Sequence, residues 1–175
     1  FANIGGDRNS AVGYQALVAN TAGNYNCALG AYSGYALQTG SNNVALGYIA
    51  LYTASTGGNN TCVGYGAGTT TNLSDNTFVG FRCGEDTTKG ELTAVGSYCL
   101  HFNTTGEKNN AFGYTALFTN NEGSHNAAFG CHSLYNNTTA SYNIAVGHNA
   151  LLANVAASHN VAIGVLALSA QAASG

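Results

Sequence analysis

The apolar residues of this chain fall in short runs that share one pattern. Residues 43–47 read Asn-Val-Ala-Leu-Gly, and residues 143–147 and 160–164 repeat it as Asn-Ile-Ala-Val-Gly and Asn-Val-Ala-Ile-Gly. Aligned on the last residue of this motif, the chain contains ten copies, spaced by 17 residues except for two steps of 16. The repeat glycines are Gly13, Gly30, Gly47, Gly64, Gly80, Gly96, Gly113, Gly130, Gly147 and Gly164. Because the repeat fills the chain, we predict a single repeat domain spanning 1–175.

Four columns around the repeat glycine are restricted to apolar or small residues. The residue immediately before the glycine is always large and apolar, and the residue two before it is alanine except at Cys62 and Phe78. The third residue after the glycine is alanine, serine or cysteine, and the fourth is leucine or glycine. We therefore predict one core column immediately before the glycine and another four residues after it, with small side chains between them.

Asparagine stands four residues before the repeat glycine in every copy but one, where Leu92 replaces it. Asparagine tolerates left-handed backbone and bonds to its own chain at turns, and stacked amides bond to one another. The glycine suits a position where a Cβ atom would clash or where φ is positive. Both columns are predicted to be structural, and the asparagines assigned to this scaffold are Asn26, Asn43, Asn60, Asn109, Asn126, Asn143 and Asn160.

The spacing of apolar residues favours strands over helices. A helical repeat would place apolar residues three and four apart over at least ten residues. Instead, short runs such as Val44–Leu46 and Ala50–Tyr52 are separated by turns rich in Thr, Ser, Asn and Gly. The prediction is two strands of three to five residues per repeat and an all-β fold, a parallel β-solenoid of about ten 17-residue coils. No large aliphatic residue recurs every six positions, which argues against a triangular hexapeptide β-helix.

One coil cannot fold alone. Ordering its backbone costs roughly 1–2 kcal/mol per residue, whereas its two large aliphatic side chains contribute only about 1.5–3 kcal/mol each. Stacking adds ladder hydrogen bonds, but the interior of one chain remains thin, and its small-residue columns suggest the close approach of another backbone. We therefore predict self-association, as a homotrimer or a self-assembling fibre.

The columns Asn-x-Ala-(Val/Leu/Ile)-Gly-x-x-Ala-Leu resemble the head repeat of YadA-type trimeric autotransporter adhesins. The likeness is greater to the longer repeat in tail-fibre and adhesin-like proteins of phages, bacteria and large viruses. The resemblance spans the chain, although adhesin heads use a shorter repeat. It implies a left-handed parallel β-roll, three chains packed side by side in a surface-exposed fibre, and scaffold roles for Asn43, Ala45, Leu46 and Gly47. Phe1 and Gly175 both fall within a coil, so we expect a fragment of a longer fibre.

Composition excludes several other functions. Only 6% of the residues are charged and the net charge is −3. The four basic residues cannot form the stripe that neutralises phosphates, so we predict no nucleic-acid binding. No window approaches the roughly twenty consecutive apolar residues of a membrane span, so no membrane insertion is expected. No phosphate loop, nucleotide fingerprint or catalytic triad spacing is present, and we expect no enzyme activity, cofactor or metal.

A polar stripe is predicted five residues before each repeat glycine, because this column is polar throughout. It is read either as a solvated face or as a face that contacts a ligand such as a surface glycan or receptor. Its candidate binding residues are Tyr25, Asn42, Asn59, Lys108, His125, Tyr142 and His159. His125 and His159 lie two coils apart, ~10 Å by the strand spacing, and cannot share a metal. Aromatic residues one and five after the glycine are read as ring ladders, a subunit interface or a sugar-binding surface.

The five cysteines suggest free thiols more than disulfides. Cys83 and Cys99 share a column one coil apart, within Cα reach of a disulfide, but parallel side chains would aim their sulfurs poorly. The odd cysteine count favours assembly in a cytoplasm before release. No Cys/His spacing indicates a metal site.

Two further features leave alternatives open. Glu85, Asp86 and Glu91 cluster where the repeat shortens, and are read either as a charged surface bulge or as the paired carboxylates of a glycan-degrading tail spike. Glycosylation sequons, which a chain rich in Asn and Thr also acquires by chance, occur at Asn59, Asn72, Asn103, Asn136 and Asn137.

These patterns together predict a structural fibre or adhesin segment with no catalysis. It would present a rigid extended surface for attachment to a host, cell or glycan, outside the cell or on a virion or cell surface. The alternatives are the glycan-degrading spike and a passive spacer shaft without ligand.

Overall fold

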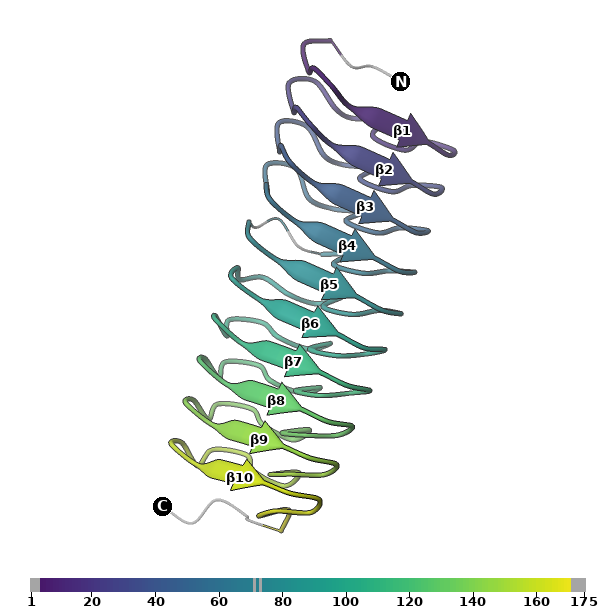
Figure 1. Ribbon diagram of the computed structural model, residues 1–175. Coiled ribbons are helices and arrows are strands. Elements are labelled where there is room, and N and C mark those ends of the chain that lie inside the picture. Colours follow the sequence, from purple (N-terminus) through teal and green to yellow (C-terminus); the bar gives the residue numbers. More distant parts are fainter. Residues whose placement is uncertain (1–3, 71, 73, 171–175) are drawn as a thin grey trace.

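The computed structural model describes residues 4–70, 72 and 74–170; Phe1 and Gly175 lie outside this part. All secondary-structure elements of the described residues are β-strands of three residues each. The strands are β1 (Ser10–Val12), β2 (Cys27–Leu29), β3 (Val44–Leu46), β4 (Thr61–Val63), β5 (Thr77–Val79), β6 (Thr93–Val95), β7 (Asn110–Phe112), β8 (Ala127–Phe129), β9 (Ile144–Val146) and β10 (Val161–Ile163). They form one parallel sheet in sequence order, with β1 and β10 at opposite ends (Figure 1).

Strand register follows the sequence repeat. Ala28 pairs with Ala45, and each repeat glycine follows its strand at the same position, so the glycines stand in single file. The two 16-residue steps keep this register, with Thr77 pairing with both Thr61 and Thr93. Each 16-residue repeat is therefore one residue shorter in the segment between its strands, not in a strand. These pairings confirm the predicted parallel β-solenoid, in which about nine turns join the ten strands.

The prediction of a second strand in each repeat is wrong. The run Ala50–Tyr52 lies in a turn, and Ile49 and Leu51 on either side of Ala50 have left-handed φ angles of 52° and 51°. Their N–H groups still bond to neighbouring coils, Ile49 to the Ala31 carbonyl and Leu51 to the Ala67 carbonyl. Apolar and β-branched residues thus occur here without extended backbone, because bonds to both neighbouring coils stabilise left-handed φ angles that these residues otherwise avoid.

The prediction of a core column immediately before the glycine is also wrong. Val12, Leu29 and Ile163 in that column are exposed, whereas Ala28 and Ala45, two residues before the glycine, are buried. Side chains alternate across a strand, so only one of these columns faces inward. The solenoid is so narrow that the inward place takes the small residue, and the large residue faces outward.

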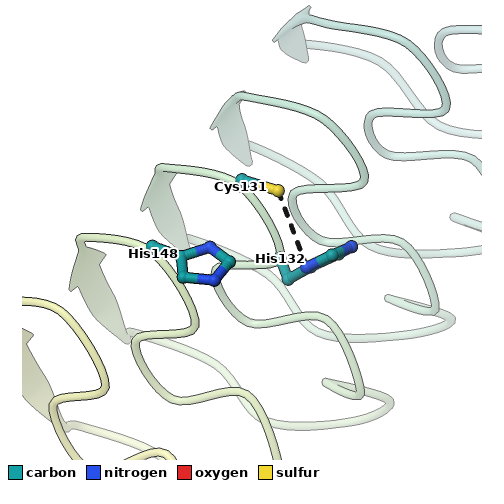
Figure 2. A group of neighbouring side chains, drawn as sticks. All are labelled: Cys131, His132 and His148. Atoms are coloured by element: carbon teal, nitrogen blue, oxygen red, sulfur yellow. Dashed lines mark hydrogen bonds between the residues drawn. The ribbon is translucent and has the colours of Figure 1, made fainter.

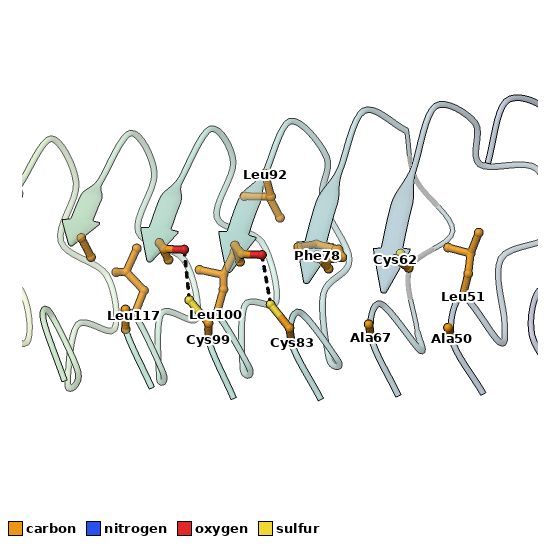
Figure 3. Packing of buried hydrophobic residues seen from close by; sticks show 14 of the residues in the cluster. Ala50, Leu51, Cys62, Ala67, Phe78, Cys83, Leu92, Cys99, Leu100 and Leu117 are labelled. Carbon is orange, nitrogen blue, oxygen red and sulfur yellow. Dashed lines mark hydrogen bonds between the residues drawn. The ribbon is translucent and has the colours of Figure 1, made fainter. Parts of the chain in front are cut away.

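The second predicted core column is confirmed. Leu51, Leu100 and Leu117, four residues after the glycine, are buried together with the small residues that precede them (Figure 3). The exceptions compensate one another: Phe78 replaces an inward alanine, and Gly84 supplies its space. A Cβ atom on Gly84 would lie 2.5 Å from Phe78 Cδ1. In this coil, the added volume of Phe78 is therefore offset by the missing side chain at Gly84.

The predicted asparagine ladder is confirmed. Asn43 is buried, and its backbone N–H and its Nδ2 both donate to Asn26 Oδ1, at 3.0 and 3.1 Å. The same Nδ2 also donates to the Gly57 carbonyl.

A second asparagine ladder, not predicted from the sequence, runs seven residues after the glycine. There, Asn120 Nδ2 donates to Asn103 Oδ1 at 2.7 Å, and Asn154 Nδ2 donates to Asn137 Oδ1 at 3.2 Å. Each side chain replaces backbone partners that a turn lacks.

Candidate functional site

The polar stripe is exposed along the molecule. All seven candidate binding residues are exposed: Tyr25, Asn42, Asn59, Lys108, His125, Tyr142 and His159. Each also has a left-handed φ between 57° and 64°. This conformation places the side chain on the outside of a tight turn just before the buried asparagine. The prediction that this column faces water is confirmed.

Contacts along the polar stripe join successive coils. Asn42 Nδ2 donates to Asn59 Oδ1 at 3.2 Å, and Asn59 Nδ2 donates to Asp75 Oδ1 at 2.9 Å. Lys108 Nζ and Glu91 Oε2 form an ion pair at 3.9 Å. Since both partners are exposed, such contacts contribute only about 0–1 kcal/mol each.

His125, Tyr142 and His159 form a stack on three consecutive coils. Ring centroids are 4.8 Å apart for His125 and Tyr142 and 5.1 Å apart for Tyr142 and His159, with interplanar angles of 5° and 11°. The faces of Tyr142 are therefore covered by its neighbours. What this part of the stripe offers to a partner is a row of ring edges, with hydroxyl and imidazole groups that can form hydrogen bonds.

Large apolar side chains cover the outward face of the sheet. We call the column immediately before the repeat glycine the outer strip: Val12, Leu29, Leu46, Val63, Val79, Val95, Phe112, Phe129, Val146 and Ile163. The side chains of β2, β9 and β10 in this column are exposed, and the rings of Phe112 and Phe129 stack at 4.9 Å and 5°. An apolar strip that follows a whole sheet is typical of an interaction surface.

Aromatic residues next to the outer strip form the predicted ring ladder. Tyr48, Tyr65 and Phe81 stand one residue after their glycines, on consecutive coils, with centroid distances of 5.3 and 5.2 Å. The column five after the glycine behaves likewise: Phe118 and Tyr135 stack at 5.1 Å and 6°. The rings of Tyr48, Tyr65 and Phe81 each remain partly exposed.

Two of the three acidic residues in the cluster, Glu85 and Glu91, form ion pairs. Arg82 binds Glu85 through two nitrogens, Nε to Oε2 and Nη2 to Oε1, the latter at 2.9 Å, and His101 Nδ1 lies 3.4 Å from Glu85 Oε2. The hydrogen bond to Glu85 raises the pKa of the Arg82 guanidinium above its ordinary value. Neither of two cavities, one at the first coil and one lined by Tyr114 and Asn149, has a carboxylate in its wall. The pairing of Glu85 is compatible with the surface bulge, and the paired carboxylates of a glycosidase stay an alternative prediction.

All five cysteines are free, and three of them are buried. Cys83 Sγ donates to the Ala94 carbonyl at 3.3 Å and Cys99 Sγ donates to the Ala111 carbonyl at 3.2 Å (Figure 3). Burial raises the pKa of the Cys62 and Cys99 thiols well above their ordinary range. The preference for free thiols over a bond between Cys83 and Cys99 is confirmed.

Two sequons are inaccessible. Asn103 and Asn137 are fully buried, and their Nδ2 atoms donate to the Gly106 and Ala140 carbonyls, respectively. An asparagine that carries a glycan must face solvent. The structure therefore excludes these two predicted positions, whereas Asn59, Asn72 and Asn136 are exposed and stay predictions.

The fold also assembles a group that our motif search passed over. Cys131, His132 and His148 come together although 15 residues separate the two histidines. The signal was present in the repeat: Cys131 and His148 both stand one residue after a repeat glycine, and His132 follows Cys131 directly. Stacking at a 17-residue period makes such residues neighbours.

No protein-family model, curated protein or solved structure matches this chain. Within the described part of the chain, no helix is long and apolar enough to cross a membrane.

Proposed function

We propose that this chain is a segment of a structural fibre or adhesin that presents a rigid, extended surface for attachment. The observation that supports this most strongly is the continuous exposure of equivalent columns along the sheet. A β-solenoid whose coils repeat in register offers the same side-chain positions again and again, about one strand spacing apart. Such a surface is suited to multivalent contact rather than to catalysis at one site.

The outer strip is proposed as the surface through which the chains associate. Within it, Leu29 and Phe129 are 52% and 41% exposed, and covering such side chains is favourable by roughly 25 cal/mol per Å². The resemblance to trimeric adhesin heads supports three chains around this strip and a left-handed winding. The polar stripe then remains available for attachment to a glycan or receptor outside the cell or on a virion.

The test of assembly is the mass of the purified chain in solution, measured by light scattering with chromatography. A trimer gives three times the chain mass of 17.7 kDa. A stable monomer would contradict the assembly part of the proposal.

The test of attachment is a glycan array probed with the assembled chain. The expected result is binding to a defined glycan class that weakens when Tyr142→Ala and Asn59→Ala are combined in the polar stripe. Assembly without any glycan or cell binding would leave the passive spacer as the function. Polysaccharide cleavage that is lost in Glu85→Gln would instead establish the enzyme.

A further inference from the structure

Three side chains with metal-binding atoms meet on two neighbouring coils. The Cys131 sulfur and ring nitrogens of His132 and His148 all lie within 4.8 Å of one another, and Cys131 Sγ is 3.5 Å from His132 Nδ1. Figure 2 shows His148 on the coil after Cys131 and His132, with its ring beside them. Cys131 and His132 are half-buried and His148 is exposed.

We propose that Cys131, His132 and His148 bind a zinc ion. A thiolate and two imidazoles form a donor set that zinc prefers over the oxygen ligands of magnesium or calcium. Bonds of about 2.0–2.3 Å in a tetrahedron place the ligand atoms roughly 3.3–3.6 Å apart. The observed spacing reaches these values through small side-chain rotations. Zinc takes the sulfur as thiolate, so binding releases the thiol proton to solvent.

Backbone bonds between coils hold the ligands near this geometry. The His132 N–H donates to the Tyr114 carbonyl, and the Asn149 N–H donates to the Cys131 carbonyl, both at 3.0 Å. The His132 ring also contacts the rings of Tyr114 and Tyr135 edge-on, with centroid distances of 5.6 and 5.5 Å. Little ordering therefore accompanies binding, which favours affinity.

An unpartnered oxygen beside the cluster is an independent observation that supports zinc. Asn149 Oδ1 is buried and has no hydrogen-bond partner among the described residues. Asn149 stands one repeat after His132, and both line a cavity of about 300 Å³. A zinc-bound imidazole carries a proton on its second nitrogen and usually donates it to an oxygen acceptor. Asn149 supplies such an acceptor in the cavity that His132 lines.

Three protein ligands leave one tetrahedral position open. Because His148 is exposed, solvent reaches this side of the cluster, and water fills the fourth position. The site lies beside the outer strip, since Cys131 and His148 follow the glycines that end β8 and β9.

The repeat itself supplies variants that should fold. Cys131→Ala, His132→Tyr and His148→Tyr each introduce a residue that another coil has in the same column, namely Ala31, Tyr32 and Tyr48. The matched controls are Cys27→Ala, an exposed cysteine outside the cluster, and His159→Tyr, which copies Tyr142 of the same column. Circular dichroism verifies that each variant keeps the wild-type fold.

The experiment is titration of the metal-free, reduced chain with Zn²⁺ by calorimetry, and with Co²⁺ as a spectroscopic substitute. We expect one zinc per chain, at least tenfold weaker binding in each cluster variant, and unchanged binding in both controls. Cobalt should give a thiolate charge-transfer absorption that Cys131→Ala removes. Absence of zinc uptake, or a loss of less than tenfold in both Cys131→Ala and His148→Tyr, would overturn the site.

Discussion

At the scale of single residues, the coil depends on backbone conformations that most side chains avoid. Gly47 has a φ of 135°, and a Cβ atom there would lie 2.4 Å from the Gly64 carbonyl oxygen. Ile49 and Leu51, by contrast, hold left-handed φ angles with side chains in place. The repeat position of Gly47 therefore requires glycine, because a side chain would both collide with the next coil and strain the backbone. At Ile49 and Leu51 a side chain fits, and only the backbone φ is unfavourable.

Replacing Gly47 by alanine should destabilise the chain by about 2–4 kcal/mol, because the added methyl group strains the backbone and collides with the next coil. The measurement is the urea midpoint of unfolding. Gly66→Asn is the control: Gly66 has a φ of 64°, and its nearest Cβ neighbours are 3.4–4.0 Å away. Asparagine tolerates that φ, so a change below about 0.5 kcal/mol is expected. Equal losses in both variants would contradict this explanation.

The buried Cys62 thiol should make stability fall at alkaline pH. Burial raises its pKa in the folded state, so it stays neutral there, whereas the unfolded thiol ionises above about pH 8.5. Stability from this group is therefore complete below that pH and declines above it, by up to about 1.4 kcal/mol per pH unit.

The check is urea unfolding at pH 7 and pH 9.5. Cys62→Ala, which copies the alanine of the same column in other coils, should reduce the pH dependence to the part that the buried Cys99 thiol, whose pKa is also raised, still causes. Cys27→Ala, at an exposed thiol, should leave it unchanged. A wild-type slope that persists in Cys62→Ala would mean that other groups cause it.

At the scale of elements, side-chain amides of the two asparagine ladders supplement the backbone bonds of three-residue strands, the second ladder in only some of the coils. Side chains of the first ladder satisfy backbone groups of the next coil, as Asn43 does with the Asn60 N–H and the Gly57 carbonyl. The sequence predicted the first ladder because asparagine fills nearly its whole column. It did not predict the second, because that column also holds Leu37, Ala54 and Thr87, so no single residue type marks it.

Asn43→Ala should cost about 2–4 kcal/mol of unfolding free energy. It removes the acceptor of the Asn60 backbone N–H and the donor to the buried Gly57 carbonyl, leaving both groups without these partners. Gln38→Ala, at an exposed position whose φ is not left-handed, is the control and should change stability by less than about 0.5 kcal/mol. Chemical denaturation measures both, and similar losses would show that the ladder is not the cause.

At the scale of the whole molecule, the outward apolar face is the feature that most needs a partner. Inward positions on the strands hold alanine, so the large residues that a wider fold would bury stay outside. The energetic argument for association made from the sequence stays a prediction, and the surface that we propose for it is the outer strip rather than the small-residue columns, which are buried within the chain.

Combining Phe129→Lys with Val146→Lys should reduce the assembled mass toward that of one chain, because two charges would be buried in the proposed interface. Combining Asn42→Lys with Asn59→Lys adds the same charge to adjacent coils of the polar stripe, where Lys108 already stands, and should leave the mass unchanged. Light scattering measures both double variants. Unchanged assembly in the first pair would exclude the outer strip as the interface.

The sequence by itself determined the repeat, its 17-residue period, the parallel stacking and the first asparagine ladder. Periodic identity reports directly which residues are equivalent. Only the tertiary structure decided which strand face is inside, that each coil has one strand, and that Cys131 and His132 meet His148. These depend on the width of the coil and on φ angles set by bonds to both neighbouring coils, and a linear pattern of apolar residues contains neither quantity.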